Sequence, residues 1–200
     1  MSFDNKNASL KASKSYFAGF TLIELIITIA IFVFMTALVM ARYNDYYSGT
    51  IFKNLAYDIA ITIREAQSYG ISVKVRADAF DKAYGAYFPG GAQSSNFSLK
   101  AFDFNDYVIP DISEKDYKLK HGAVFQSFTV SGNDSDYTNA SNLAIIFQRP
   151  DPEAIICAVV DGTQNCSGYK YAKIKILAVD GVTTMTVKVN SSGQIAIYNN

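Results

Sequence analysis

The sequence predicts an α+β protein in which one long N-terminal helix packs on an antiparallel, β-rich head. The first observation is an apolar run over residues 20–41 that is interrupted by a single charge, Glu24. The second is a one-sided helical pattern that resumes at residue 50 and continues to residue 69. The third is a second half rich in Val, Ile, Thr and aromatic residues, which favour strands, in a chain with 14 Tyr and 14 Phe.

The apolar run is long enough to cross a membrane. At about 1.5 Å of rise per residue, it covers the roughly 30 Å of a bilayer core. An ionisable side chain near the centre of a membrane helix costs about 2.5–3.5 kcal/mol, and less near its end. Since Glu24 lies one turn into the run, its cost is reduced, but its carboxylate still needs a partner.

A short polar leader, residues 1–19, precedes the run. It holds three lysines against one aspartate, a net charge of +2, and positive charge at this position favours a cytoplasmic location for that end. A secretory signal peptide would have a shorter apolar core followed by a small-residue cleavage pattern. The residues that follow here, RYND at 42–45, do not have that pattern. An uncleaved signal anchor remains an alternative on these residues alone.

The segment GFTLIE, residues 19–24, joins the leader to the apolar run. This junction resembles the processing site of type IV pilins and type II secretion pseudopilins, which also combine a basic leader with a membrane-length run. The resemblance implies that a prepilin peptidase cuts after Gly19 and then methylates the new amine of Phe20. Gly19 suits such a cut because it has no side chain to keep a peptidase from the backbone.

The same resemblance assigns Glu24 to filament assembly. Cleavage frees a cationic amine at Phe20, and Glu24 lies four residues further on the same helix face. The family's useful partner is the amine of a neighbouring subunit, so that the buried charge is satisfied only on assembly. The implied partners are the prepilin peptidase, other pilin or pseudopilin subunits, an inner-membrane assembly platform and, before assembly, membrane lipid.

The helix is expected to span residues 20–70. In its second half the apolar positions recur at three- and four-residue steps, at Phe52, Leu55, Ile59, Ile63 and Ala66. Gly70 is placed to end the helix, and Gly49 is a position at which it could bend.

Residues 71–200 are expected to form short strands separated by turns. The strands are expected over 71–75, 84–88, 97–104, 124–130 and 143–148, with 103–120 as an irregular acidic loop or short helical turn. The loop 131–136 carries carboxylates, but it lacks the glycine and terminal glutamate of an EF-hand. A solvated turn is therefore favoured there over a calcium site.

The end of the chain is expected to form a three-stranded meander that packs on the stripe of residues 52–63. Its strands are expected over 171–179, 182–189 and 194–198, the first two joined by the hairpin signal Asp180-Gly181. The segments 147–154, 180–181 and 189–195 resemble those of the H-type (GspH/FimT-like) minor pseudopilins.

Cys157 and Cys166 are the two cysteines of the chain. In a head outside the cytoplasm they are free to oxidise, and a bridge over so short a loop stabilises a fold by about 2–3 kcal/mol. Buried free thiols are the alternative.

Composition argues against an enzyme. Eighteen basic residues balance eighteen acidic ones, His121 is the single histidine, and no catalytic-serine, zinc-protease or phosphate-binding motif occurs. No cofactor or metal is expected. The favoured function is a structural pilin-like subunit, and the alternative is a membrane-anchored extracytoplasmic binding module, adhesin-like or DNA-binding. The expected location is the bacterial inner membrane, crossed once, with a cytoplasmic leader (1–19) and an extracytoplasmic head (71–200).

Overall fold

A single helix, α1, runs from Leu22 to Ile71, close to the expected span. The segment contains no proline and only two glycines, Gly49 and Gly70, and the helix continues through Gly49. The computed structural model describes residues 19–72, 82–90, 93–104, 107, 113–133 and 138–199. The chain divides into two compact units, Met1–Asn44 and Asp45–Asn200, and α1 contributes to both.

In the first unit, every side chain from Leu22 to Ala41 is exposed, although nearly all of them are apolar. This segment is long and apolar enough to cross a membrane by length and composition. The hydroxyl of Thr28 donates to the Leu25 carbonyl at 2.9 Å, and that of Thr36 donates to the Phe32 carbonyl at 2.8 Å. These two hydroxyls therefore find acceptors in their own helix and need none from outside.

In the second unit, α1 contributes one stripe of side chains to the core. The expected stripe is confirmed, because its members are almost completely buried: Phe52, Leu55, Ala56, Ile59, Ile63 and Ala66. Strands from both sheets of the head belong to the same core cluster. The part of α1 that follows residue 51 is thus held by packing of one face.

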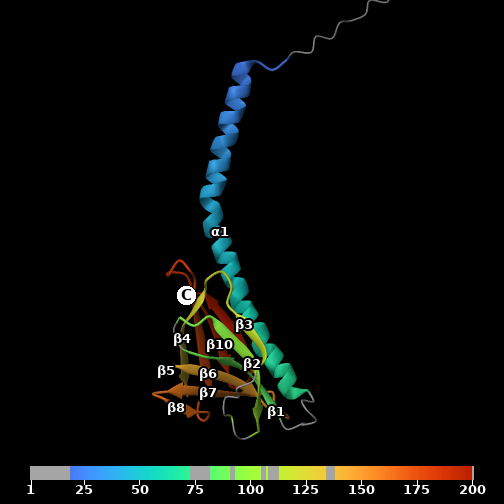
Figure 1. Ribbon diagram of the computed structural model, residues 1–200, viewed down its shortest axis with the longest axis vertical. Coiled ribbons are helices and arrows are strands. Elements are labelled where there is room, and N and C mark those ends of the chain that lie inside the picture. Colours follow the sequence, from blue (N-terminus) through green and yellow to red (C-terminus); the bar gives the residue numbers. More distant parts are fainter. Residues whose placement is uncertain are drawn as a thin grey trace, which may run out of the picture. The chain divides into compact units, whose positions relative to one another are not determined.

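The first sheet has six strands, all paired antiparallel, in the order β3-β2-β1-β6-β7-β8 (Figure 1). Its strands are β1 (Lys82–Phe88), β2 (Asn96–Asp103), β3 (Ser113–Lys118), β6 (Asn142–Phe147), β7 (Ala154–Val160) and β8 (Thr163–Asn165).

The second sheet has five strands in the order β11-β10-β9-β4-β5, again antiparallel. Its strands are β4 (Val124–Ser131), β5 (Thr138–Ala140), β9 (Tyr171–Leu177), β10 (Thr184–Asn190) and β11 (Ile195–Asn199). The meander β9-β10-β11 is as expected. Its inward residues, among them Ile174, Ile176 and Val187, share the core with the α1 stripe.

Phenylalanine rings fill the space between the sheets. Phe88 of β1 stacks on Phe97 of β2 with centroids 5.6 Å apart, and meets Phe125 of β4 edge-on at the same distance. Phe128 lies 5.3 Å from Phe125. The aromatic content of the sequence therefore serves the core of the head.

A second, smaller core covers the outer face of the six-stranded sheet. Its buried members are Ala83, Phe102, Ala144, Ile146 and Cys157, and Cys166 packs against it. Cys157 and Cys166 form a disulfide between β7 and the residue that follows β8. The Gln164 amide donates to the Tyr107 carbonyl at 2.7 Å, which ties this corner to the segment after β2.

Four strands of the head were not expected from the sequence, and one expected strand is not confirmed. The expected loop at 103–120 contains strand β3, whose sequence SEKDYK has the charges of an exposed edge strand rather than apolar alternation. The short strands β5 and β8 and the longer strand β7 were not expected either. Of the strand expected over 71–75, Ile71 is the last residue of α1, and residues 73–75 lie outside those that the structure describes.

The two-residue hairpin turn expected at Asp180-Gly181 occurs instead at the other Asp-Gly pair, Asp161-Gly162. Asp161 and Gly162 both have positive φ, 49° and 79°, and form the two-residue hairpin turn between the paired residues Val160 and Thr163. The β9-β10 connection is longer, because its strand pairing ends at Leu177 and Thr184. There the Asp180 carboxylate accepts hydrogen bonds from the amides of Val182 and Thr183, at 2.9 and 2.8 Å.

Gly70 does not end the helix, which includes it and stops one residue later. Its lack of a side chain lets α1 approach β6: a Cβ at this position would lie 2.4 Å from the Phe147 carbonyl oxygen. Nearby, the Arg64 guanidinium donates to the Gly193 carbonyl at 3.3 Å, and the Gln67 amide donates to the Pro152 carbonyl at 3.1 Å. These contacts dock the β10-β11 turn and the segment before β7 on α1.

Candidate processing and assembly site

The start of α1 is capped by Thr21. Its hydroxyl accepts a hydrogen bond from the Glu24 amide at 3.3 Å, and its carbonyl accepts the first helical bond, from the Leu25 amide, at 3.2 Å. These two bonds define an N-cap residue. Thr-x-x-Glu is also the sequence of a capping box, a signal that the sequence analysis did not use.

Glu24 lies in the first turn of α1, three residues after the cap. The amide groups of a helix N-terminus carry partial positive charge, which favours a carboxylate at this position. The Glu24 side chain is exposed and has no hydrogen-bond or ion-pair partner among the residues that the structure describes. The helix end thus reduces the cost of the charge while leaving the carboxylate oxygens available.

The junction Gly19-Phe20 lies outside the helix. Both residues are exposed, Phe20 to 84%. Apart from the chain neighbours of Gly19, no atom of the described residues lies within 4 Å of the position that its Cβ would take. Both residues precede α1, and Glu24 lies in its first turn. The segment from Leu22 to Ala41 is exposed, and apart from Glu24 and two threonines it is apolar.

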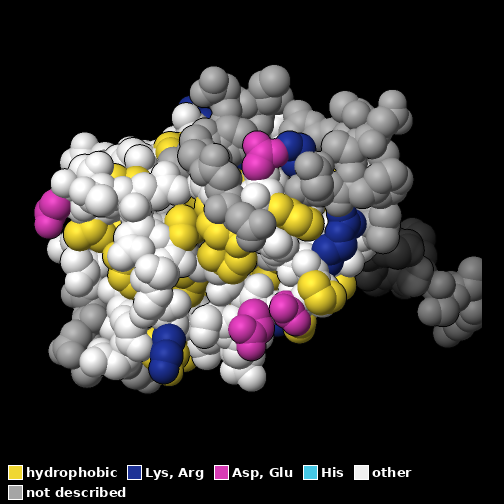
Figure 2. All heavy atoms as spheres, turned by 90° about the horizontal axis from the view of Figure 1, so that it is seen from below, with side chains coloured by type: hydrophobic (Ala, Val, Ile, Leu, Met, Phe, Trp, Pro, Cys, Tyr) yellow, Lys and Arg dark blue, Asp and Glu magenta, His cyan; other side chains and the backbone are white. Residues whose placement is uncertain are grey.

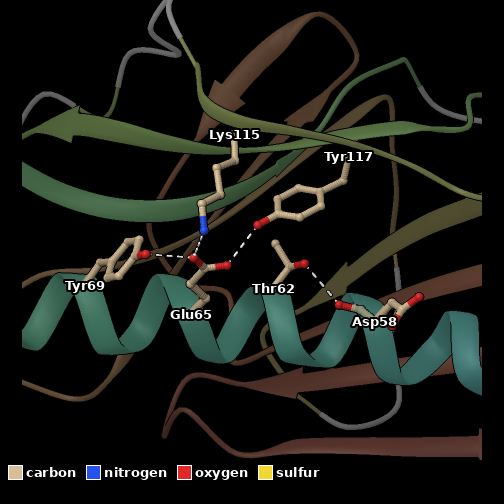
Figure 3. A network of polar contacts seen from close by, with 6 residues as sticks. All are labelled: Asp58, Thr62, Glu65, Tyr69, Lys115 and Tyr117. Carbon is tan, nitrogen blue, oxygen red and sulfur yellow. Dashed lines mark hydrogen bonds and ion pairs between the residues drawn. The ribbon is translucent and has the colours of Figure 1, made fainter.

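A network of polar contacts surrounds Glu65 of α1 (Figure 3). One carboxylate oxygen pairs with Lys115 of β3 and accepts the Tyr69 hydroxyl at 2.8 Å. The other accepts the Tyr117 hydroxyl at 2.8 Å. Because Lys115 and Tyr117 belong to β3, these bonds fasten the edge strand to the helix.

The titration of Glu65 reflects these contacts. Burial raises the pKa of the Glu65 carboxyl, but hydrogen bonds from Lys115, Tyr69 and Tyr117 outweigh it, so the pKa is lowered overall. Burial and then the hydrogen bond to Glu65 raise the pKa of Tyr117 to about 12. Both shifts favour an ionised carboxylate beside a neutral phenol. The arrangement explains the attachment of β3 to α1.

Two other candidates from the sequence were His121 and the loop 131–136. Among the described residues, no three His, Cys, Asp or Glu side chains lie close enough to hold a metal ion. His121 is exposed in a turn with φ of 56°. In the loop 131–136, which was compared with a calcium site, Asp134 and Asp136 lie outside the described residues.

The face of the molecule in Figure 2 shows hydrophobic side chains near its middle, with acidic and basic side chains around them.

Comparison with protein families found one match. Residues 14–40 match the family described as the prokaryotic N-terminal methylation motif. Neither the curated proteins nor the solved structures gave a match. The motif supports the pilin-like resemblance of the N-terminal segment, and an apolar N-terminal helix followed by antiparallel sheets is the layout of a pilin-like fold. The H-type resemblance of the C-terminal segments has no counterpart in these comparisons.

Proposed function

We propose that this chain is the precursor of a structural, non-enzymatic subunit of a pilin-like filament. A prepilin peptidase cuts it between Gly19 and Phe20 and methylates the new amine. The observation that carries the proposal is the methylation motif at residues 14–40, which covers an exposed, membrane-length apolar helix. Glu24 is the one charge within Leu22–Ala41.

In this proposal the chain has three parts. Residues 1–19 are the leader, which stays in the cytoplasm; residues 20–70 form the helix; and residues 71–200 form the head, which lies outside the cytoplasm. The net charge of +2 on the leader supports that orientation. The Cys157–Cys166 disulfide supports an oxidising compartment for the head.

Assembly would solve two problems posed by the helix. The apolar surface of Leu22–Ala41 is far too extensive to remain in water, so it lies in the bilayer before assembly and among like helices afterwards. The Glu24 carboxylate would meet the Phe20 amine of a neighbouring subunit, a partner created only by cleavage. Glu24 then selects the axial position of each incoming subunit rather than stabilising the monomer.

Within the pilin-like class, we assign the subunit to a type II secretion pseudopilus or a type IV pilus, among the H-type minor subunits. The contacts between the resembling segments support this assignment. The Ala154 amide donates to the Ser191 carbonyl at 2.7 Å, and the Gly193 turn packs beside the Pro152 carbonyl and Gln67. Segments 147–154 and 189–195 therefore form one structural corner at α1.

The processing step is tested by intact mass and N-terminal sequencing of protein extracted from membranes. When the chain is expressed with an active prepilin peptidase, we expect it to begin at methylated Phe20. A chain that keeps its leader under these conditions contradicts the proposal.

The assembly step is tested with Glu24→Gln, which keeps the size of the side chain and removes its charge. We expect normal cleavage and loss of incorporation into filaments, measured by shearing filaments from cells and detecting this subunit. Glu24→Asp, which keeps the charge on a shorter stem, is the matched control and should retain part of the incorporation. Normal incorporation of Glu24→Gln would show that the charge is not used.

A further inference from the structure

The Thr21 hydroxyl accepts a hydrogen bond that would otherwise go to a backbone carbonyl nearer the leader and lengthen the helix at its N-terminus. In a longer helix, the Glu24 amide would donate to the carbonyl four residues earlier, which is that of Phe20. Here it donates to Thr21 Oγ1 instead, at 3.3 Å, and α1 begins at Leu22. The cap therefore leaves the Phe20 and Gly19 carbonyls out of the helical ladder.

The Gly19 carbonyl is the group that a peptidase must attack. Hydrolysis between Gly19 and Phe20 adds water to the Gly19 carbonyl carbon and requires donors for the oxygen that becomes negative. If α1 began two residues earlier, the Ile23 amide would donate to that oxygen and the scissile bond would be helical. In a membrane, first-turn amides without a cap have few other acceptors, so removal of the cap favours this extension.

We propose that Thr21 is a positioning residue for leader cleavage: its side-chain cap stops α1 just after the scissile bond and presents Gly19-Phe20 as non-helical backbone. The exposure of Phe20 agrees with this role, as does the lack of any described residue, other than its chain neighbours, within 4 Å of a Cβ on Gly19. The inference rests on the proposed processing at this bond. It assigns to Thr21 a role separate from the charge of Glu24 and from the small size of Gly19.

The test compares full-length precursors in detergent, cut by a purified prepilin peptidase and followed by mass spectrometry. Thr21→Val keeps the shape of the side chain and removes the acceptor, whereas Thr21→Ser and Thr21→Asn keep a capping oxygen on different shapes. Thr28→Val is the matched control, because the Thr28 hydroxyl bonds the Leu25 carbonyl within the helix and caps nothing.

We expect kcat/KM to fall about fivefold for Thr21→Val, the population change that corresponds to loss of a typical N-cap. Thr21→Ser, Thr21→Asn and Thr28→Val should be cut at nearly the native rate. Hydrogen exchange supplies a second readout: the Ile23 amide should exchange more slowly in Thr21→Val, because the lengthened helix gives it the Gly19 carbonyl as acceptor.

Two results overturn this inference alone, with the native precursor still being cut. One is native-rate cleavage of Thr21→Val. The other is slow cleavage of Thr21→Asn, which would show that the peptidase recognises the threonine itself. If the native precursor is not cut between Gly19 and Phe20, both the proposed processing and the role of Thr21 are wrong.

Discussion

Replacement of Gly70 by alanine tests how closely α1 packs on the first sheet. An added Cβ would lie 2.4 Å from the Phe147 carbonyl oxygen and 2.8 Å from its carbonyl carbon. Ordinary contact begins near 3.4 Å, so α1 and β6 would have to separate by about 1 Å. Because both atoms belong to the backbone, no side-chain rotation can relieve the overlap.

The magnitude follows from two opposing effects. Alanine in a helix interior is favoured over glycine by about 1 kcal/mol. Overpacking of a close contact costs about 1–3 kcal/mol, and a clash with backbone belongs at the upper end of that range. We therefore expect Gly70→Ala to lower the free energy of unfolding of the head by about 2 kcal/mol.

Gly49→Ala is the matched control, because Gly49 lies in the same helix and, among the described residues outside the neighbouring helix backbone, no atom lies within 4 Å of the added Cβ. It should leave the head unchanged or stabilise it by up to about 1 kcal/mol. The assay is urea unfolding of the full-length protein in detergent, followed by the fluorescence of head tyrosines. If Gly70→Ala unfolds at the same urea concentration as the native protein, the close approach of α1 to β6 does not constrain the fold.

Two further predictions concern the head. The pKa of Glu65 is lowered in the folded state, so its contribution to stability is present above the unfolded pKa of about 4.5 and is lost as pH falls through the folded value. The native protein should therefore exceed Glu65→Gln in stability at pH 7, with a difference that shrinks below about pH 4.5 in urea titrations; a constant difference would contradict the role of the ionised carboxylate. Replacing both Cys157 and Cys166 by alanine should lower the free energy of unfolding by about 2–3 kcal/mol, and a reducing agent should destabilise the native protein but not this variant.

The sequence alone predicted the parts of the fold in which apolar residues recur at a regular spacing. The stripe from Phe52 to Ala66 has the period of a helix, and the strands β9 and β10 alternate between inward apolar and outward polar residues. Cys157 and Cys166, nine residues apart, also allowed their pairing to be expected. In each case the information is local.

Features that the sequence did not predict depend mainly on contacts between segments that are far apart in the chain. Strand β3 is polar because it forms a sheet edge, and its pairing with β2 and with Glu65 cannot be read from SEKDYK alone. Gly70 looks like a helix terminator until the β6 backbone is seen beside it. The cap at Thr21 is different, because the local sequence Thr-x-x-Glu indicates it, although Glu24 was interpreted only through its charge.

The packing of one face of α1 into a core shared by both sheets has a mechanical consequence. A pull along the axis of the helix must slide the whole stripe from Phe52 to Ala66 past its neighbours at once, because these side chains are buried in one core with residues of both sheets. Contacts loaded in parallel resist such sliding better than contacts that open one after another. Cys157 and Cys166 lie in the other core, on the outer face of the first sheet, so the disulfide takes little of that tension. The buried part of α1 can therefore pass tension to the head through this core.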